Sequence, residues 1–169
     1  MSCDGRAEAV LVAGLGNPLM GDDGFGVAVV EALGSRSLAA GVSLCTAPDV
    51  LHLSSSWRGE PRVWLVDVVV GGARPGTIHR FDHDAVLSLP AHPASAHHLA
   101  LAESLRWLLH ATPAMRAVRF RLWGAEPSRL APGDRLSRPL VAAVASVVDE
   151  IVREADESTV CRASSAGRS

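Results

Sequence analysis

The segment VLVAGLGNPLMGDDGFG at residues 10–26 decides the fold, because an apolar run passes through a glycine-rich turn directly into two acidic residues. Residues 9–14 have the uninterrupted apolar character of a strand that is buried on both faces. Residues 24–34 continue as a helix whose apolar positions share one side. Ligands of α/β proteins bind beyond the carboxyl ends of the strands, so Asp22 and Asp23 stand where a functional site is expected.

Strand and helix patterns alternate along the rest of the chain. Further strands are predicted at 42–45, 62–70, 75–81 and 118–123, the last of them half-buried or at an edge, and further helices near 50–53, at 95–110 and at 137–153. This order predicts an α/β fold of the three-layer, phosphorylase/hydrolase-like kind, with a twisted, mostly parallel sheet of about five strands and helices on both faces. Residues 1–155 are expected to form a single domain, and the polar residues 156–169 a disordered tail.

Composition excludes several classes of partner. A net charge of −2 without a basic block offers no electrostatic footprint for nucleic acid. No apolar run reaches the roughly 18 residues of a membrane span, and the N-terminus lacks a signal pattern, so we expect a cytoplasmic protein without a membrane partner. Cys3, Cys45 and Cys161 are widely spaced and odd in number, which argues against a disulfide framework and a CxxC metal site.

Three acidic residues lie at positions that need an explanation. Asp22 is explained equally well by capping the following helix or by function, but one cap cannot use both adjacent carboxylates, so Asp23 is the better ligand candidate. Asp67 interrupts an apolar strand, where an unpartnered carboxylate costs several kcal/mol. We therefore expect Asp67 either at a cleft or bonded to a loop N–H group.

A histidine pair completes the set of candidate ligands. His97 and His98 begin a predicted helix after a proline-bounded loop, and a histidine alone is more often structural than a ligand. Strand ends and helix starts of a doubly wound sheet converge on one crevice, however, which would bring one of this pair to Asp23 and Asp67. Such a mixed oxygen and nitrogen set suits zinc, nickel, iron or manganese, and three protein ligands leave positions open for water or a partner's group.

The same segments resemble those of a known family. GLGNPLMGDDGFG at residues 14–26 closely resembles the signature of the nickel-iron hydrogenase maturation endopeptidases. In the same order, LVDV at 65–68 with ARPGTI at 73–78 resembles the family's second acidic motif, SAHHLAL at 95–101 its histidine motif, and GAEP at 124–127 with Leu136-Ser137 its late loop. The resemblance spans residues 9–152, which makes it more specific than a single glycine pattern.

This resemblance implies a function and a site. The family removes the C-terminal extension of the hydrogenase large-subunit precursor once nickel, carried by that substrate, has been inserted. Its metal-contacting positions fall on Asp23, Asp67 and His97, and this site would be empty or partly filled in the isolated protein. We expect the protein to be a monomer or a weak oligomer. We expect the metal or an adjacent carboxylate to activate a water molecule, with Asp23 in the catalytic site and Asp22 as an accessory base.

One segment departs from the family pattern, and three alternatives remain open. Where the family commonly has an acidic-glycine-glycine-threonine turn, this chain has CTAPD at 45–49, so Asp49 either supplies the carboxylate from a shifted position or caps a helix.

One alternative function is a non-catalytic nickel-sensing chaperone. GLGNP at 14–18 also resembles the opening of peptidyl-tRNA hydrolase, an esterase that acts on RNA, but the chain lacks that family's following histidine-asparagine segment. A dinucleotide-binding module would need glycine in place of Leu19, and the adjacent acids would repel a phosphate.

Overall fold

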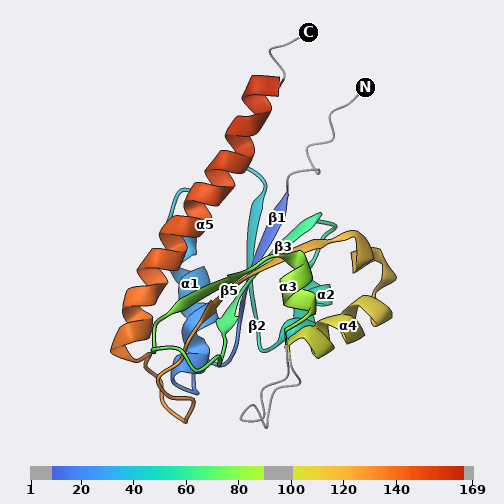
Figure 1. Ribbon diagram of the computed structural model, residues 1–169. Coiled ribbons are helices and arrows are strands. Elements are labelled where there is room, and N and C mark those ends of the chain that lie inside the picture. The colour runs from blue at the N-terminus through green and yellow to red at the C-terminus, as the bar shows by residue number, and fades with distance from the viewer. Residues whose placement is uncertain (1–8, 90–100, 166–169) are drawn as a thin grey trace.

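The computed structural model describes residues 9–89 and 101–165, and it shows a five-stranded sheet between two helical layers (Figure 1). The sheet has the order β2-β1-β3-β5-β4, with bounds β1 Val10–Leu15, β2 Val42–Ala47, β3 Arg62–Val68, β4 Ile78–Phe81 and β5 Arg119–Ala125. All neighbouring strands are parallel except β4, which is antiparallel to β5. The predicted α/β class and the mostly parallel sheet of about five strands are confirmed.

The helices divide between the two faces of the sheet (Figure 1). One face is covered by α1 (Phe25–Gly34) and α5 (Arg138–Ser165), and the other by α2 (Leu53–Ser56), α3 (His83–Leu87) and α4 (Leu101–Ala111). Within the described residues, three short 3-10 helices lie in the connections: η2 (Asp22–Gly24), η3 (Val50–His52) and η4 (Pro113–Ala117). None of the described helices is both long enough and apolar enough to span a membrane.

Side-chain alternation in the strands builds a separate apolar core on each face. In β1, Val10 and Val12 pack toward α1 and α5, whereas Leu11, Ala13 and Leu15 pack toward α2, α3 and α4. All six residues of β1 are buried, since the strand lies inside the sheet and helices cover both of its faces. The same alternation places Asp67 of β3 on the face of Val63 and Leu65.

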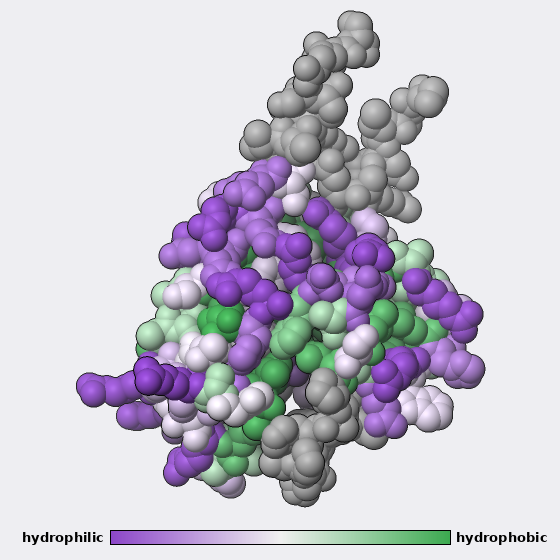
Figure 2. Space-filling view, in the orientation of Figure 1, coloured by the Kyte–Doolittle hydropathy of each residue, from purple (hydrophilic) through white to green (hydrophobic). Residues whose placement is uncertain are grey.

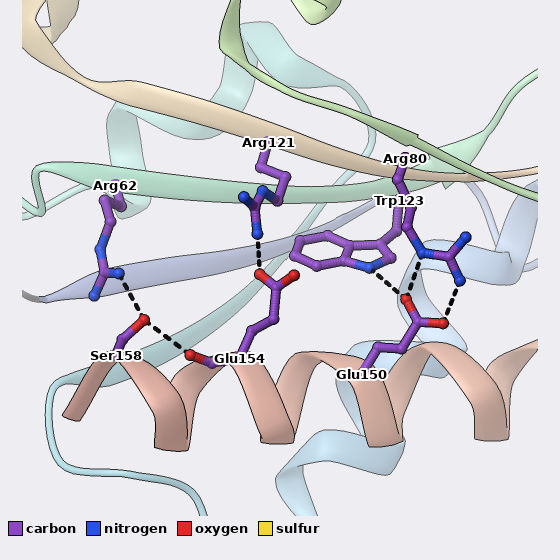
Figure 3. Close-up of polar contacts among 7 residues, drawn as sticks. All are labelled: Arg62, Arg80, Arg121, Trp123, Glu150, Glu154 and Ser158. Carbon is purple, nitrogen blue, oxygen red and sulfur yellow. Dashed lines mark hydrogen bonds and ion pairs between the residues drawn. The ribbon is translucent and has the colours of Figure 1, made fainter. Parts of the chain in front are cut away.

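The last helix is longer than predicted. α5 continues to Ser165, so the disorder predicted for residues 156–169 is wrong for 156–165, and residues 166–169 lie outside the described chain. Polar side chains of α5 reach across to the sheet through the pairs Arg80–Glu150, Trp123–Glu150, Arg121–Glu154 and Arg62–Ser158 (Figure 3). Composition alone suggested a solvated tail from residue 156, but Ser158 within it bonds Arg62 of β3, and Glu150 and Glu154 in the preceding turns find partners on β4 and β5. In Figure 2 the coloured surface over the middle of α5 is mostly hydrophilic, whereas hydrophobic and weakly polar residues mix over the lower part of this helix.

Two other elements differ from the sequence prediction. β5 is not an edge strand, because it pairs with both β3 and β4; its alternating pattern arises where Arg121 reaches over to Glu154. The short helix α3 was not predicted, although Asp82 is a normal N-cap that accepts a bond from Ala85 N at 3.0 Å. The predicted loop at 89–94 and the start of the helix predicted at 95–110 fall almost entirely outside the described residues.

Candidate functional site

Asp23 is held at the carboxyl end of β1 by the turn that follows the strand. After Leu15 the chain turns at Gly16 and Asn17 and enters η2, which contains Asp23. The backbone N–H of Asn17 donates to Oδ2 of Asp23 over 2.8 Å, and the Asp23 residue is buried. The turn and the acid are therefore one structural unit.

Two glycines permit this geometry. Gly16 has φ +115°, and a Cβ there would lie 1.9 Å from the carbonyl oxygen of Asp23, so a side chain fits neither the backbone nor the space. At Gly26 in α1, a Cβ would lie 2.3 Å from the carbonyl oxygen of Val66 and 2.4 Å from that of Leu15. The start of α1 therefore rests directly on the backbones of β1 and β3, and η2 contacts β3.

Asp67 lies close enough to Asp23 for the two charges to interact. Burial raises the pKa of Asp67 to about 7; the Val68 N–H, which donates to Oδ1 at 2.7 Å, opposes this shift, and the negative charge of Asp23 adds to it. A carboxyl group with a pKa near 7 exchanges protons readily at neutral pH. Asp23 and Asp67 are thus near neighbours in the described structure, while the site that they are predicted to form with His97 stays a prediction.

Asp22 does not cap the following helix. Its carboxylate instead accepts bonds from the loop after β5: from Ser128 N (2.7 Å), Arg129 N (3.0 Å), Ser137 N (2.6 Å) and the Ser137 hydroxyl (2.9 Å). Burial disfavours the charge, but these four donors outweigh it and hold the pKa of Asp22 below its ordinary value. A carboxylate with a lowered pKa is a weak proton acceptor, so these contacts do not favour the predicted role of Asp22 as an accessory base. They favour a role in holding the loop after β5 in place.

Glu126 anchors a second loop, a role that was not predicted for it. Buried at the end of β5, it accepts bonds from Gly71 N (3.0 Å) and Gly72 N (2.8 Å), and Oε2 lies 3.2 Å from His79 Nε2. Burial on its own would raise the pKa of Glu126, but the hydrogen-bond donors together lower it by more, so its pKa lies below the ordinary value. The signal available in the sequence was an acidic residue directly after an apolar strand. Asp22 and Asp23 also follow an apolar strand, but across a glycine-rich turn.

The predicted metal-contacting set is only partly described. Asp23 and Asp67 are brought together, whereas His97 lies outside the described residues. Across residues 9–89 and 101–165, no group of three or more His, Cys, Asp or Glu side chains is arranged to hold a metal ion. Two neighbouring carboxylates are nevertheless hard oxygen donors of the kind that bind metal ions.

The remaining candidates have structural partners. Asp49 is the N-cap of η3: Oδ1 accepts a bond from Leu51 N at 2.8 Å and lies 2.8 Å from His52 Nδ1, which confirms the cap interpretation. Cys45 is a half-buried free thiol, and burial raises its pKa, which disfavours the thiolate that a nucleophile requires.

Comparison with known proteins identifies the family. The family model for hydrogenase maturation proteases matches residues 46–154. The chain belongs to the hydrogenase maturation protease family. It is 31% identical over 145 residues to the hydrogenase expression/formation protein HoxM of Cupriavidus necator, a match that covers 83% of this chain and 71% of HoxM.

Solved structures agree with this assignment. The hydrogenase maturating endopeptidase HybD of Escherichia coli has 27% sequence identity and a TM-score of 0.74, with 89% of this chain and 93% of HybD covered. The hydrogenase 2 maturation peptidase of a Thaumarchaeota archaeon has 26% identity and a TM-score of 0.62, with 86% and 97% covered. The protein is thus a hydrogenase maturation endopeptidase, and four residues of the divergent CTAPD segment lie inside the matched range.

Proposed function

We propose that this endopeptidase removes the C-terminal extension of a nickel-iron hydrogenase large-subunit precursor after nickel insertion. The single observation that carries the proposal is the placement of Asp23 beside Asp67 at the carboxyl edge of the sheet in a member of this family. Asp23, Asp67 and His97 would contact the nickel that the substrate carries. Two carboxylates and an imidazole add oxygen and nitrogen ligands only when a metal is present, so recognition depends on a loaded precursor.

The reaction is a peptide-bond hydrolysis in which a water molecule is the nucleophile. Its oxygen adds to the scissile carbonyl carbon, the C–N bond breaks, and one proton is transferred to the leaving amine. Asp23 belongs to this catalytic site, next to the substrate's metal. Asp22 keeps its place in the site as a positioning residue, since its four bonds fix the loop at 128–137 against η2. We expect a monomer or weak oligomer in the cytoplasm, to be checked by sizing and cell fractionation.

Mass spectrometry of the precursor tests this function directly. The purified protein is incubated with nickel-loaded and nickel-free large-subunit precursor, and loss of the C-terminal peptide is expected only in the loaded sample. Asp23→Asn and His97→Ala should abolish trimming, and the matched control Asp49→Asn, which alters an exposed cap at the same sheet edge, should retain it. Cleavage by both site variants at the wild-type rate would overturn the site, and nickel-dependent binding without cleavage would indicate a chaperone.

A further inference from the structure

Two large apolar side chains are exposed on the loops that flank Asp23. Leu19 is 68% exposed and Leu130 is 43% exposed, although leucine is usually buried. Single exposed apolar residues are common on soluble proteins and need no explanation. These two residues differ because the segments that contain them, far apart in sequence, lie together in space.

Backbone pairing joins the two segments, residues 17–21 and 128–133, which we call the paired loops. Gly133 N donates to Leu19 O over 3.0 Å, and Gly21 N donates to Gly133 O over 2.8 Å. Bridge pairing also links Gly21 with Leu130. Leu19 and Leu130 therefore project from one small, continuous surface rather than from independent loops.

The paired loops are held rigidly. The buried carboxylate of Asp22 accepts bonds from Ser128 N and Arg129 N, and Asp22 N donates to Arg129 O over 3.3 Å. The side-chain oxygen of Asn17 accepts a bond from Leu19 N at 2.9 Å. A surface fixed in this way loses little conformational entropy when a partner binds, which favours specific recognition.

The surface is continuous with the acidic site. Asn17, whose side chain fixes Leu19, also donates its backbone N–H to Asp23 at 2.8 Å, so Leu19 and Asp23 are fixed by the same residue. A peptide bound at Asp23 would therefore lie near the paired loops. A second copy of the protein on this surface would instead cover the site, which favours the substrate as the occupant.

We propose that Leu19 and Leu130 form an apolar contact surface that binds an extended segment of the precursor, with an aliphatic side chain next to the scissile bond. This inference rests on the proposed function and names the part of the substrate that the site recognises. Burial of both leucines against the precursor removes apolar surface from water and so favours binding. The two leucines would contribute to binding of the precursor without taking part in proton transfer.

Kinetics of the Leu19→Ser, Leu130→Ser and double variants test the proposal. Loss of two apolar contacts is expected to raise KM for nickel-loaded precursor about 5- to 20-fold in the double variant, with kcat within about twofold of wild type. The matched control is Val141→Ser, a 58% exposed aliphatic residue on α5. Leu19→Met combined with Leu130→Met should restore the wild-type KM, since size and polarity are nearly kept. Thermal unfolding should be unchanged in all variants, because the replaced side chains are exposed.

Each outcome decides the inference separately from the function. If wild type trims the precursor and the double serine variant has a wild-type KM, the apolar surface is wrong while the protease function stands. A rise in KM of the same size for Val141→Ser would also overturn the assignment to the paired loops. If wild type leaves the precursor intact, the proposed function fails, and equilibrium binding of the same precursor to wild type and double variant tests the surface alone.

Discussion

At the scale of single residues, Asp67 shows how the fold accepts a cost at its site. Its pKa of about 7 lies far above the ordinary carboxyl value, because burial and the charge of Asp23 disfavour ionisation. The folded state therefore holds the proton more tightly than the unfolded chain. This group's contribution to stability is fully present below pH about 4 and is lost as pH rises through about 7.

Asp67→Asn should accordingly stabilise the protein at high pH. We expect the free energy of unfolding to rise by about 1–3 kcal/mol relative to wild type at pH 8, and by much less at pH 5, because asparagine does not ionise. Urea unfolding of both proteins at the two pH values measures this difference. The same variant should lose precursor trimming. An equal change in stability at both pH values would show that burial of the charge is not the cause.

At the scale of elements, α5 makes contacts that its composition did not predict. Glu154 pairs with Arg121 and Ser158 with Arg62 (Figure 3). Ala155, between them on α5, is buried against the core. Surface ion pairs alone contribute little to stability, so burial of Ala155 and the continuous helix matter as much as the charges. Residues 154–158 are thus part of the folded unit.

Two truncations distinguish the contribution of residues 154–165 to stability from that of residues 166–169. Removal of residues 154–169 is expected to lower the free energy of unfolding by about 2–4 kcal/mol, since packing and two polar contacts are lost together. Removal of residues 166–169 alone should change it by less than about 0.5 kcal/mol. Thermal and urea unfolding of the two truncated proteins provide the measurement, and equal stability of both would mean that 154–165 contribute nothing.

How far the sequence predicted these elements depends on where their partners lie. The apolar run of β1 identifies a buried strand because the pattern itself records burial on two faces. Asp23 and Asp67 were placed at the site because each follows or interrupts such a run. Contacts between distant segments leave no local pattern, so the anchoring of residues 128–137 by Asp22 was not predicted, nor was the folding of residues 156–165 as part of α5.

At the scale of the whole molecule, buried or partly buried carboxylates make stability depend on pH in the acidic range. Donors from distant segments hold the pKa values of Asp22 and Glu126 below their ordinary values, and Arg80 does the same for Glu150. Groups with lowered pKa values stabilise the fold above the unfolded-state pKa, near 4, and this contribution is lost as pH falls through the lowered folded-state values. These three groups therefore favour unfolding in acid, opposite in sign to Asp67.

Acid unfolding should consequently involve both loops at the site. We expect the free energy of unfolding to fall steeply below pH about 4, and the fall to be smaller in Glu126→Gln, which is already weakened at neutral pH by about 1–3 kcal/mol. Urea titrations from pH 3 to pH 7 measure both effects. An unchanged acid slope in this variant would contradict the role assigned to Glu126.

The contact of Gly26 with the carbonyls of Leu15 and Val66 has a consequence for anyone who transfers this site to another scaffold. Because backbone contacts backbone there, the distance between Asp23 and Asp67 is set by packed peptide groups and not by side chains that could change rotamer. With a larger residue in place of Gly26, the start of α1 would have to move away from β1 and β3, and Asp23 would move with it relative to Asp67. A transferred site would therefore have to include Gly16 and Gly26 together with Asp23 and Asp67, because these glycines allow the close approach of the backbone segments.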